Sequence, residues 1–157
     1  MDYSYGLAMG LHTLAALVWV GGMFFAHLIL RPAVLDLGLA ERLDLMRRVF
    51  GRFFPWVLGC IATLLVTGYG VLLVGYRGGL GGGGGHVDIM QMTGLVMMVL
   101  FVQLFFGPWQ GFRRALAEGN LEKAVGYQTR IRHIVIVNLV LGLVTVFIGT
   151  VGSLLGT

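Results

Sequence analysis

Hydrophobic residues dominate four long stretches of the chain and leave polar connections between them. The stretches cover residues 5–30, 54–74, 87–106 and 131–155. Because a bilayer core about 30 Å thick is crossed by roughly 20 apolar residues in a helix, each stretch is long enough to span it. Asp88 is the only acidic residue in these stretches and Arg132 the only basic one. The pattern predicts an all-α fold, an integral membrane four-helix bundle.

The connections between the stretches differ from one another. Residues 31–53 place five arginines and three acidic residues among apolar positions, which predicts an interfacial amphipathic segment near 38–52. Residues 75–86 contain an unbroken glycine run from Gly81 to Gly85. No Lys-Ser or Lys-Thr pair follows this run, so it indicates a flexible tether rather than a phosphate-binding loop.

The composition agrees with a membrane protein. Hydrophobic residues make up 57% of the 157 residues and charged residues only 11%, whereas soluble domains carry about a quarter charged residues. This length leaves room for one domain, and we interpret residues 1–157 as a single transmembrane domain. The N-terminus lacks the basic region of a signal peptide, so we expect the first apolar stretch to be retained as a helix.

The basic residues predict an orientation in the membrane. The connections 31–53 and 107–132 carry five Lys or Arg each, and the connection 75–86 carries one. Because cytoplasmic loops are enriched in basic residues, we expect these two connections in the cytoplasm and both termini outside, in a bacterial-type inner membrane. The net charge of +4 then serves contact with anionic headgroups of the lipid bilayer, and no nucleic-acid partner is expected.

Four histidines are the main candidates for chemistry inside the bundle. His12 and His27 share the first stretch, about 22 Å apart along a helix axis and roughly 60° apart around it. His133 opens the fourth stretch at the level of His27, and His86 lies at the outer mouth of the third. Ionisable residues within a membrane are costly and therefore candidate functional sites. His27 and His133 could ligate one haem iron or metal ion, and His12 a second centre.

Methionines offer a second kind of ligand. Met90 and Met92 lie with His86 near the outer end of the third stretch, and Met9 precedes His12. Thioethers beside imidazoles suit copper, particularly Cu(I), so we include Met90 and Met92 among the candidate metal ligands. The alternative is that these methionines are adaptable hydrophobic side chains.

Two further polar residues complete the candidate cofactor-binding set. Asn138 lies in the fourth stretch and is expected to donate a hydrogen bond between helices. Arg130 precedes that stretch and could pair with a haem propionate, or anchor the helix at the cytoplasmic surface. Glycines recur within the stretches and favour close helix packing, with space for a flat cofactor as the alternative. No catalytic arrangement of Ser-His-Asp, Cys-His or paired carboxylates occurs, which argues against hydrolytic chemistry.

Several segments resemble a known family. The segment from Leu11 to Gly22, the Arg-rich start of the fourth stretch at residues 130–132, and Asn138 to Gly142 are similar to short CopD-like proteins, relatives of the copper-resistance D membrane domain. Arg47-Arg48 and Phe54-Pro55 extend the likeness across all four stretches. The resemblance implies copper handling.

The first stretch also resembles the HemJ-type protoporphyrinogen oxidases. That resemblance implies a role for His12 as a haem ligand or catalytic residue. The sequence departs from the pattern in two places, because the third stretch lacks the lysine of that family and the last stretch lacks its acidic residue.

Three functions follow as hypotheses. We favour a haem b-binding protein that transfers electrons or serves a quinone-linked oxidoreductase, because two histidine levels about 22 Å apart suit stacked haems. The alternative is a copper transporter or buffer that uses His and Met. A structural membrane subunit is the third. Quinone or a redox partner protein, and a homo-oligomer or larger membrane complex, are the expected partners.

Overall fold

The computed structural model describes residues 3–75 and 84–155. Its elements are α1 (Tyr3–Phe24), the π-helix η1 (Phe25–Leu30), α2 (Arg31–Ala33), α3 (Leu39–Gly75), α4 (Gly85–Phe106), α5 (Pro108–Ala117) and α6 (Leu121–Leu155). Four helices in this part of the chain are long and apolar enough to cross a membrane. The predicted all-α membrane bundle is therefore confirmed. Most of the glycine run and Arg77 lie outside the described residues.

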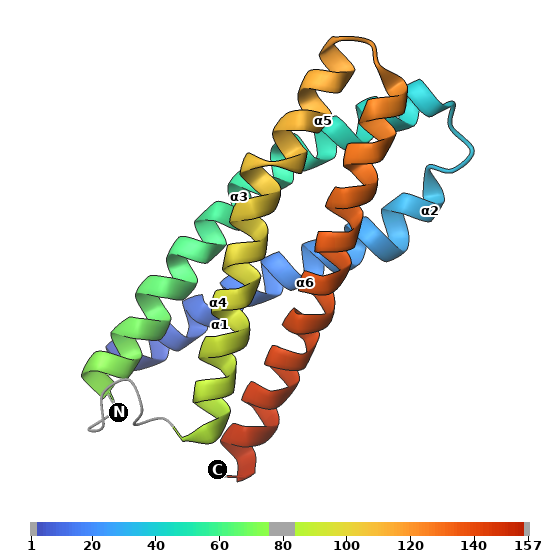
Figure 1. The fold of residues 1–157 in the computed structure, drawn as a ribbon. Coiled ribbons are helices and arrows are strands. Elements are labelled where there is room, and N and C mark those ends of the chain that lie inside the picture. The colour runs from blue at the N-terminus through green and yellow to red at the C-terminus, as the bar shows by residue number, and fades with distance from the viewer. Residues whose placement is uncertain (1–2, 76–83, 156–157) are drawn as a thin grey trace.

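The four long helices run alternately up and down. Figure 1 shows that α1 and α4 begin, and α3 and α6 end, at one end of the bundle, while α2 and α5 lie toward the other. We refer to these as the outer end and the inner end, after the predicted orientation. Large apolar side chains cover the outside of the helices, such as Val66 and Phe147, which are 74% and 67% exposed. Such a surface is suited to lipid.

The amphipathic segment predicted near 38–52 is helical, and it is continuous with the second span. Residues 39–53 form the first part of α3, which continues through Pro55 into the second span. The reason lies in the spacing of Leu43, Phe50, Phe54 and Val57, which are buried on one face of the helix before and after Pro55. Since this apolar face is buried on both sides of the proline, packing holds the helix continuous where local signals favour a break.

The connection at 107–132 also contains helical structure that the sequence pattern does not predict. α5 begins with Pro108 directly after Gly107, and α6 already starts at Leu121, ten residues before the predicted span. Asn120 accepts a hydrogen bond from the backbone N–H of Lys123 at 3.0 Å and so caps the start of α6. Gly119 adopts a φ of 69° between the two helices, a conformation that glycine allows at low cost.

Aromatic rings fill the inner half of the bundle. Phe54 of α3 contacts Trp109 of α5 with ring centroids 5.1 Å apart, and Phe101 of α4 at 5.5 Å. Trp19 of α1 meets Phe101 edge to face at 6.2 Å. Edge-to-face pairs of this kind each add about 0.5–1.5 kcal/mol beyond burial. The rings therefore connect α1, α3, α4 and α5.

Glycines allow close contact between helices elsewhere, as the packing interpretation expected. A methyl group at Gly142 of α6 would lie 2.7 Å from Val20 of α1 and 3.1 Å from Met97 of α4. Buried Asn138 donates a hydrogen bond from Nδ2 to the carbonyl of Met97 at 3.2 Å, which confirms its predicted interhelical role. Thr145 of α6 donates to Thr93 of α4 at 2.7 Å. α1, α4 and α6 thus meet at Gly142.

We predict that Gly142→Ala destabilises the protein by about 1–3 kcal/mol, because the β-branched Val20 side chain cannot move away without shifting α1. Gly94→Ala on α4 is the control, since a methyl group there meets nothing within 4 Å. It should leave stability unchanged or raise it by about 0.5–1 kcal/mol through helix propensity. Unfolding in mild detergent titrated with a denaturing detergent measures both. Equal stability of the two variants would contradict this account of the packing.

Candidate functional site

His12 lies at the contact between α1 and α3, near the outer end. Its Nδ1 is 2.9 Å from the hydroxyl oxygen of Thr67. A methyl group at the neighbouring Gly68 would lie 3.1 Å from Cε1 of the imidazole, so the ring packs directly on the α3 backbone. Thr67 is buried and His12 is partly buried. The hydrogen bond to Thr67 and the contact with Gly68 together fix the position of the imidazole ring.

The hydrogen bonds of Thr67 determine which nitrogen of His12 carries the proton. The Thr67 hydroxyl donates its single proton to the carbonyl of Thr63, 2.6 Å away. Toward His12 the hydroxyl oxygen can therefore only accept, and Nδ1 of the imidazole must be the donor. In the neutral ring, Nε2 then has no proton and keeps a free lone pair. This is the arrangement in which histidines bind metals, with the second nitrogen donating to a neighbouring oxygen.

Two thioethers lie close to the level of this imidazole along the bundle axis. Met9 is one turn before His12 on α1, and side chains three residues apart are neighbours on a helix face. Met90 of α4 packs against Gly149 of α6, where a methyl group would lie 2.7 Å from its Sδ. Val20 of α1 and Met97 of α4 meet at Gly142, and α1 and α4 run in the same direction. His12 lies about 12 Å before Val20 along α1, and Met90 lies about 10 Å before Met97 along α4. His12 and Met90 therefore share one level of the bundle.

The other two outer candidates take different positions. His86 packs against Gly152 of α6, on the same face of α4 that carries Met90 to Gly149. Met92 is 66% exposed on the outside of α4. Among residues 3–75 and 84–155, no three His, Cys, Asp or Glu side chains converge as a metal-binding group. In this part of the chain, His12 therefore does not belong to a group of three such side chains.

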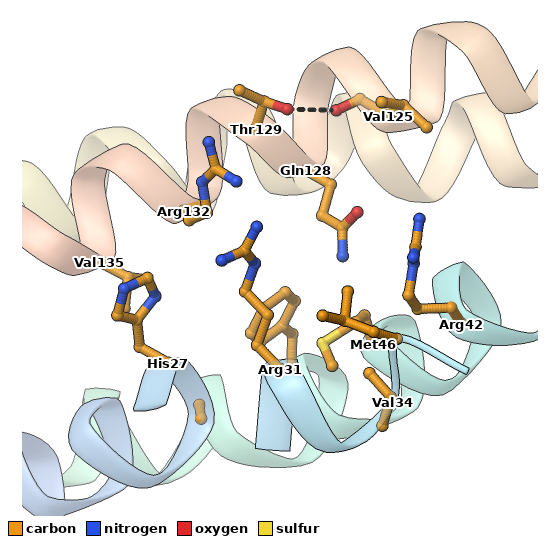
Figure 2. A pocket seen from close by; sticks show the side chains of 13 residues that line it. His27, Arg31, Val34, Arg42, Met46, Val125, Gln128, Thr129, Arg132 and Val135 are labelled. Carbon is orange, nitrogen blue, oxygen red and sulfur yellow. Dashed lines mark hydrogen bonds between the residues drawn. The ribbon is translucent and has the colours of Figure 1, made fainter. Parts of the chain in front are cut away.

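The inner candidates are also separated. His27 lies in η1 and lines a cavity together with Arg31 and Arg132 (Figure 2). His133, although adjacent to Arg132 in sequence, is exposed and does not line that cavity. The π-helical turns at 25–30 also change the 60° angle expected between His12 and His27, which assumed a regular α-helix. The structure does not bring His27 and His133 to one shared space.

Arg130 and Asn138 occupy unlike surroundings. Arg130 is exposed, with its guanidinium 6.0 Å from the centre of the Tyr127 ring. Asn138 is 1% exposed, and its Oδ1 has no hydrogen-bond partner although it is buried. Sequence reasoning missed Thr67 and Gly68, which orient His12. The sequence does contain a Thr-Gly pair, Thr67-Gly68, at the depth of His12. Its role can be recognised only when α1 is known to pack against α3.

The fold is that of a multi-pass helical membrane protein, and its outer end holds one oriented imidazole. Comparison with known proteins is consistent with this. The sequence profile of the family Copper resistance protein D matches residues 47–152, and the chain belongs to this family. The match begins within α3, so it includes Thr67, Gly68 and Met90 but not His12. The resemblance to CopD-like proteins is confirmed, and the HemJ-type resemblance gains no support.

One curated relative is an uncharacterized protein of Aquifex aeolicus, 25% identical over 158 residues, which cover 95% of both chains. No solved structure matches the chain. Haem b, which the histidine levels favoured, is supported neither by the family nor by the arrangement of the described side chains. Copper is nearer to the description of the matched family.

We predict that the ¹⁵N NMR spectrum of His12 shows a protonated Nδ1 and an unprotonated Nε2 under alkaline conditions that keep imidazoles neutral. Thr67→Val should remove this preference, because it deletes the acceptor while preserving shape. The His12→Gln variant assigns the signal, and exposed His133 serves as the reference ring. A preference unchanged in Thr67→Val would show that the threonine does not orient the ring.

Proposed function

We propose that this protein handles copper in the membrane, and that His12 binds Cu(I) through Nε2 near the outer end. The observation that carries the proposal is the chain from His12 Nδ1 to Thr67 and on to the carbonyl of Thr63, at 2.9 and 2.6 Å. It leaves the other ring nitrogen as a free donor to a metal. The name of the matched family supports copper as the ion.

The surrounding side chains support the monovalent ion. Cu(I) prefers soft ligands, and the thioethers of Met9 and Met90 lie close to the level of His12 along the bundle axis. The Asp88 carboxylate of α4 lies at this level too, but it is a hard ligand that Cu(I) does not prefer. The ligands would come from α1, which packs on α3, and from α4, which packs on α6. A site shared between two pairs of helices can exchange its ion, as a transported or buffered ion requires. The copper ion in this proposal is cargo rather than a resident cofactor.

Copper titration of the purified protein in mild detergent tests the proposal. We expect one Cu(I) per chain, measured anaerobically by competition with a chromogenic Cu(I) chelator. Thr67→Val should weaken binding by about 10–100-fold, the usual cost of losing the partner of a ligating histidine. His12→Ala should weaken it further, because the ligand itself is lost.

Two variants serve as matched controls for this titration. His133→Ala removes an exposed imidazole at the inner end and should leave Cu(I) affinity unchanged. Met92→Leu removes an exposed thioether and should do the same, whereas Met90→Leu should weaken binding. Equal affinity of wild type and His12→Ala, or no Cu(I) binding at all, would overturn the proposal.

We also propose that the outer end faces away from the cytoplasm, on the basis of the arginine-rich inner end. In a Cys60→Ala background, Gly85→Cys at the start of α4 should react with a membrane-impermeant maleimide in intact cells. Glu118→Cys, exposed after α5, should react only after the membrane is opened. The reverse pattern would invert the orientation.

A further inference from the structure

A cavity of about 190 Å³ lies at the inner end of the bundle, enclosed by η1, α2, α3 and α6. Figure 2 shows Arg31 and Arg42 extending from their helices toward α6 and Gln128 extending from α6 toward them, and Arg132 of α6 also lines the cavity. The wall between them is apolar and includes Val34, Met46, Phe50 and Val135. The cavity therefore combines a cationic rim with a hydrophobic wall.

The charges around this cavity are unbalanced. No Asp or Glu is among its lining residues. Within the described part of the chain, the ion pairs join Asp44 to Arg47 and Arg48, and none involves a cavity arginine. The three guanidinium groups therefore face one cavity without a carboxylate to offset their mutual repulsion.

The hydrogen bonding of Arg132 is also incomplete. Its Nε is buried and has no hydrogen-bond partner. A buried donor of a charged group is costly unless an acceptor meets it. The hydroxyl of Thr129, the nearest small polar group along α6, is already committed to the carbonyl of Val125 at 3.0 Å. As the described side chains lie, none of them supplies an acceptor to the Nε proton of Arg132.

We infer that Arg31, Arg42 and Arg132 form a binding site for a phosphate group, either on an anionic phospholipid or free in solution. Guanidinium forks match phosphate oxygens in pairs, and a phosphate offers enough acceptors for several of them. The Gln128 amide supplies a neutral donor at the same place. The volume is below the roughly 300–1,000 Å³ of pockets for larger organic ligands, which suits a headgroup-sized anion.

The position and the wall favour the phospholipid as the source. Arg31 and Arg132 lie at the ends of apolar spans, where headgroups meet the bundle. Basic pockets between transmembrane helices on the cytoplasmic side suit anionic headgroups in this way. The apolar side chains beside the rim can contact the glycerol and first methylene groups, which free phosphate lacks. The site is independent of the copper proposal, since no residue is shared with the outer end.

Native mass spectrometry of the delipidated full chain in mild detergent tests the site. The probes are short-chain phosphatidylglycerol and, for comparison, zwitterionic phosphatidylcholine. We expect phosphatidylglycerol to bind about tenfold or more tightly, since hydrogen bonds to charged groups account for differences of that size. Sodium phosphate against sodium chloride of equal ionic strength distinguishes the two sources. Displacement of the lipid by millimolar phosphate alone would identify free phosphate as a competent occupant of the same site.

Substitutions then locate the binding. Arg42→Gln and Arg132→Gln should each weaken phosphatidylglycerol binding about tenfold or more. Arg52→Gln is the matched control, because Arg52 lies on α3 like Arg42 but is exposed outside the cavity. Arg132→Lys keeps the charge without the fork and should fall between wild type and Arg132→Gln, which excludes simple misfolding as the cause.

The inference is overturned if the Arg42→Gln/Arg132→Gln double variant, folded by circular dichroism, binds phosphatidylglycerol and phosphate as the wild type does. It is also overturned if Arg52→Gln causes the same loss, because the effect would then reflect net charge alone.

Discussion

The contact between Phe54 and Trp109 holds together the inner half of the bundle. These rings meet edge to face, and Phe50 and Phe101 close around them. Lipid tails are as apolar as these side chains, so simple burial gives little drive to helix association, and close packing must supply it. By holding α5 against α3, the rings determine where α6 begins. The position of α6 in turn places Gln128 and Arg132 opposite Arg31 and Arg42.

The outer half is held by a different means. There, glycines admit side chains from the neighbouring helix, as Gly68 admits His12 and Gly149 admits Met90. Hydroxyl groups add specific links, such as Thr145 to Thr93. The packing of the outer half involves smaller and more polar groups than the aromatic packing of the inner half. The hydrogen bonds of Thr67 leave Nε2 of His12 available in this half, which is why chemistry is expected there.

The sequence pattern was sufficient to predict the four spans, because the thickness of the membrane requires a minimum length of apolar residues. That length can be recognised in the sequence alone. It was insufficient for the continuity of α3, since Pro55 and the arginines suggest a break and only the buried face of Phe50 and Phe54 opposes it. The partners of His12 could not be predicted either. Thr67 is 55 residues away, and a threonine in a span ordinarily bonds only its own helix, as Thr63 does. The arginines were recognised as anchors, but their convergence depends on three elements that meet only in the fold.

The π-helix between Phe25 and Leu30 has a consequence for the whole first helix. A π-turn accommodates one more residue than an α-turn, so it offsets the rotation of everything before it by about 100° relative to everything after it. Residues before and after the π-helix can therefore face pairs of directions that the same sequence spacing would not give in a regular α-helix. The face that His12 presents to Thr67 and the face that Arg31 presents to α6 are matched by this single irregularity. The first helix is in effect two helices joined end to end, with their side chains rotated relative to one another about the helix axis. The number of residues in the π-helical segment 25–30 determines this rotation.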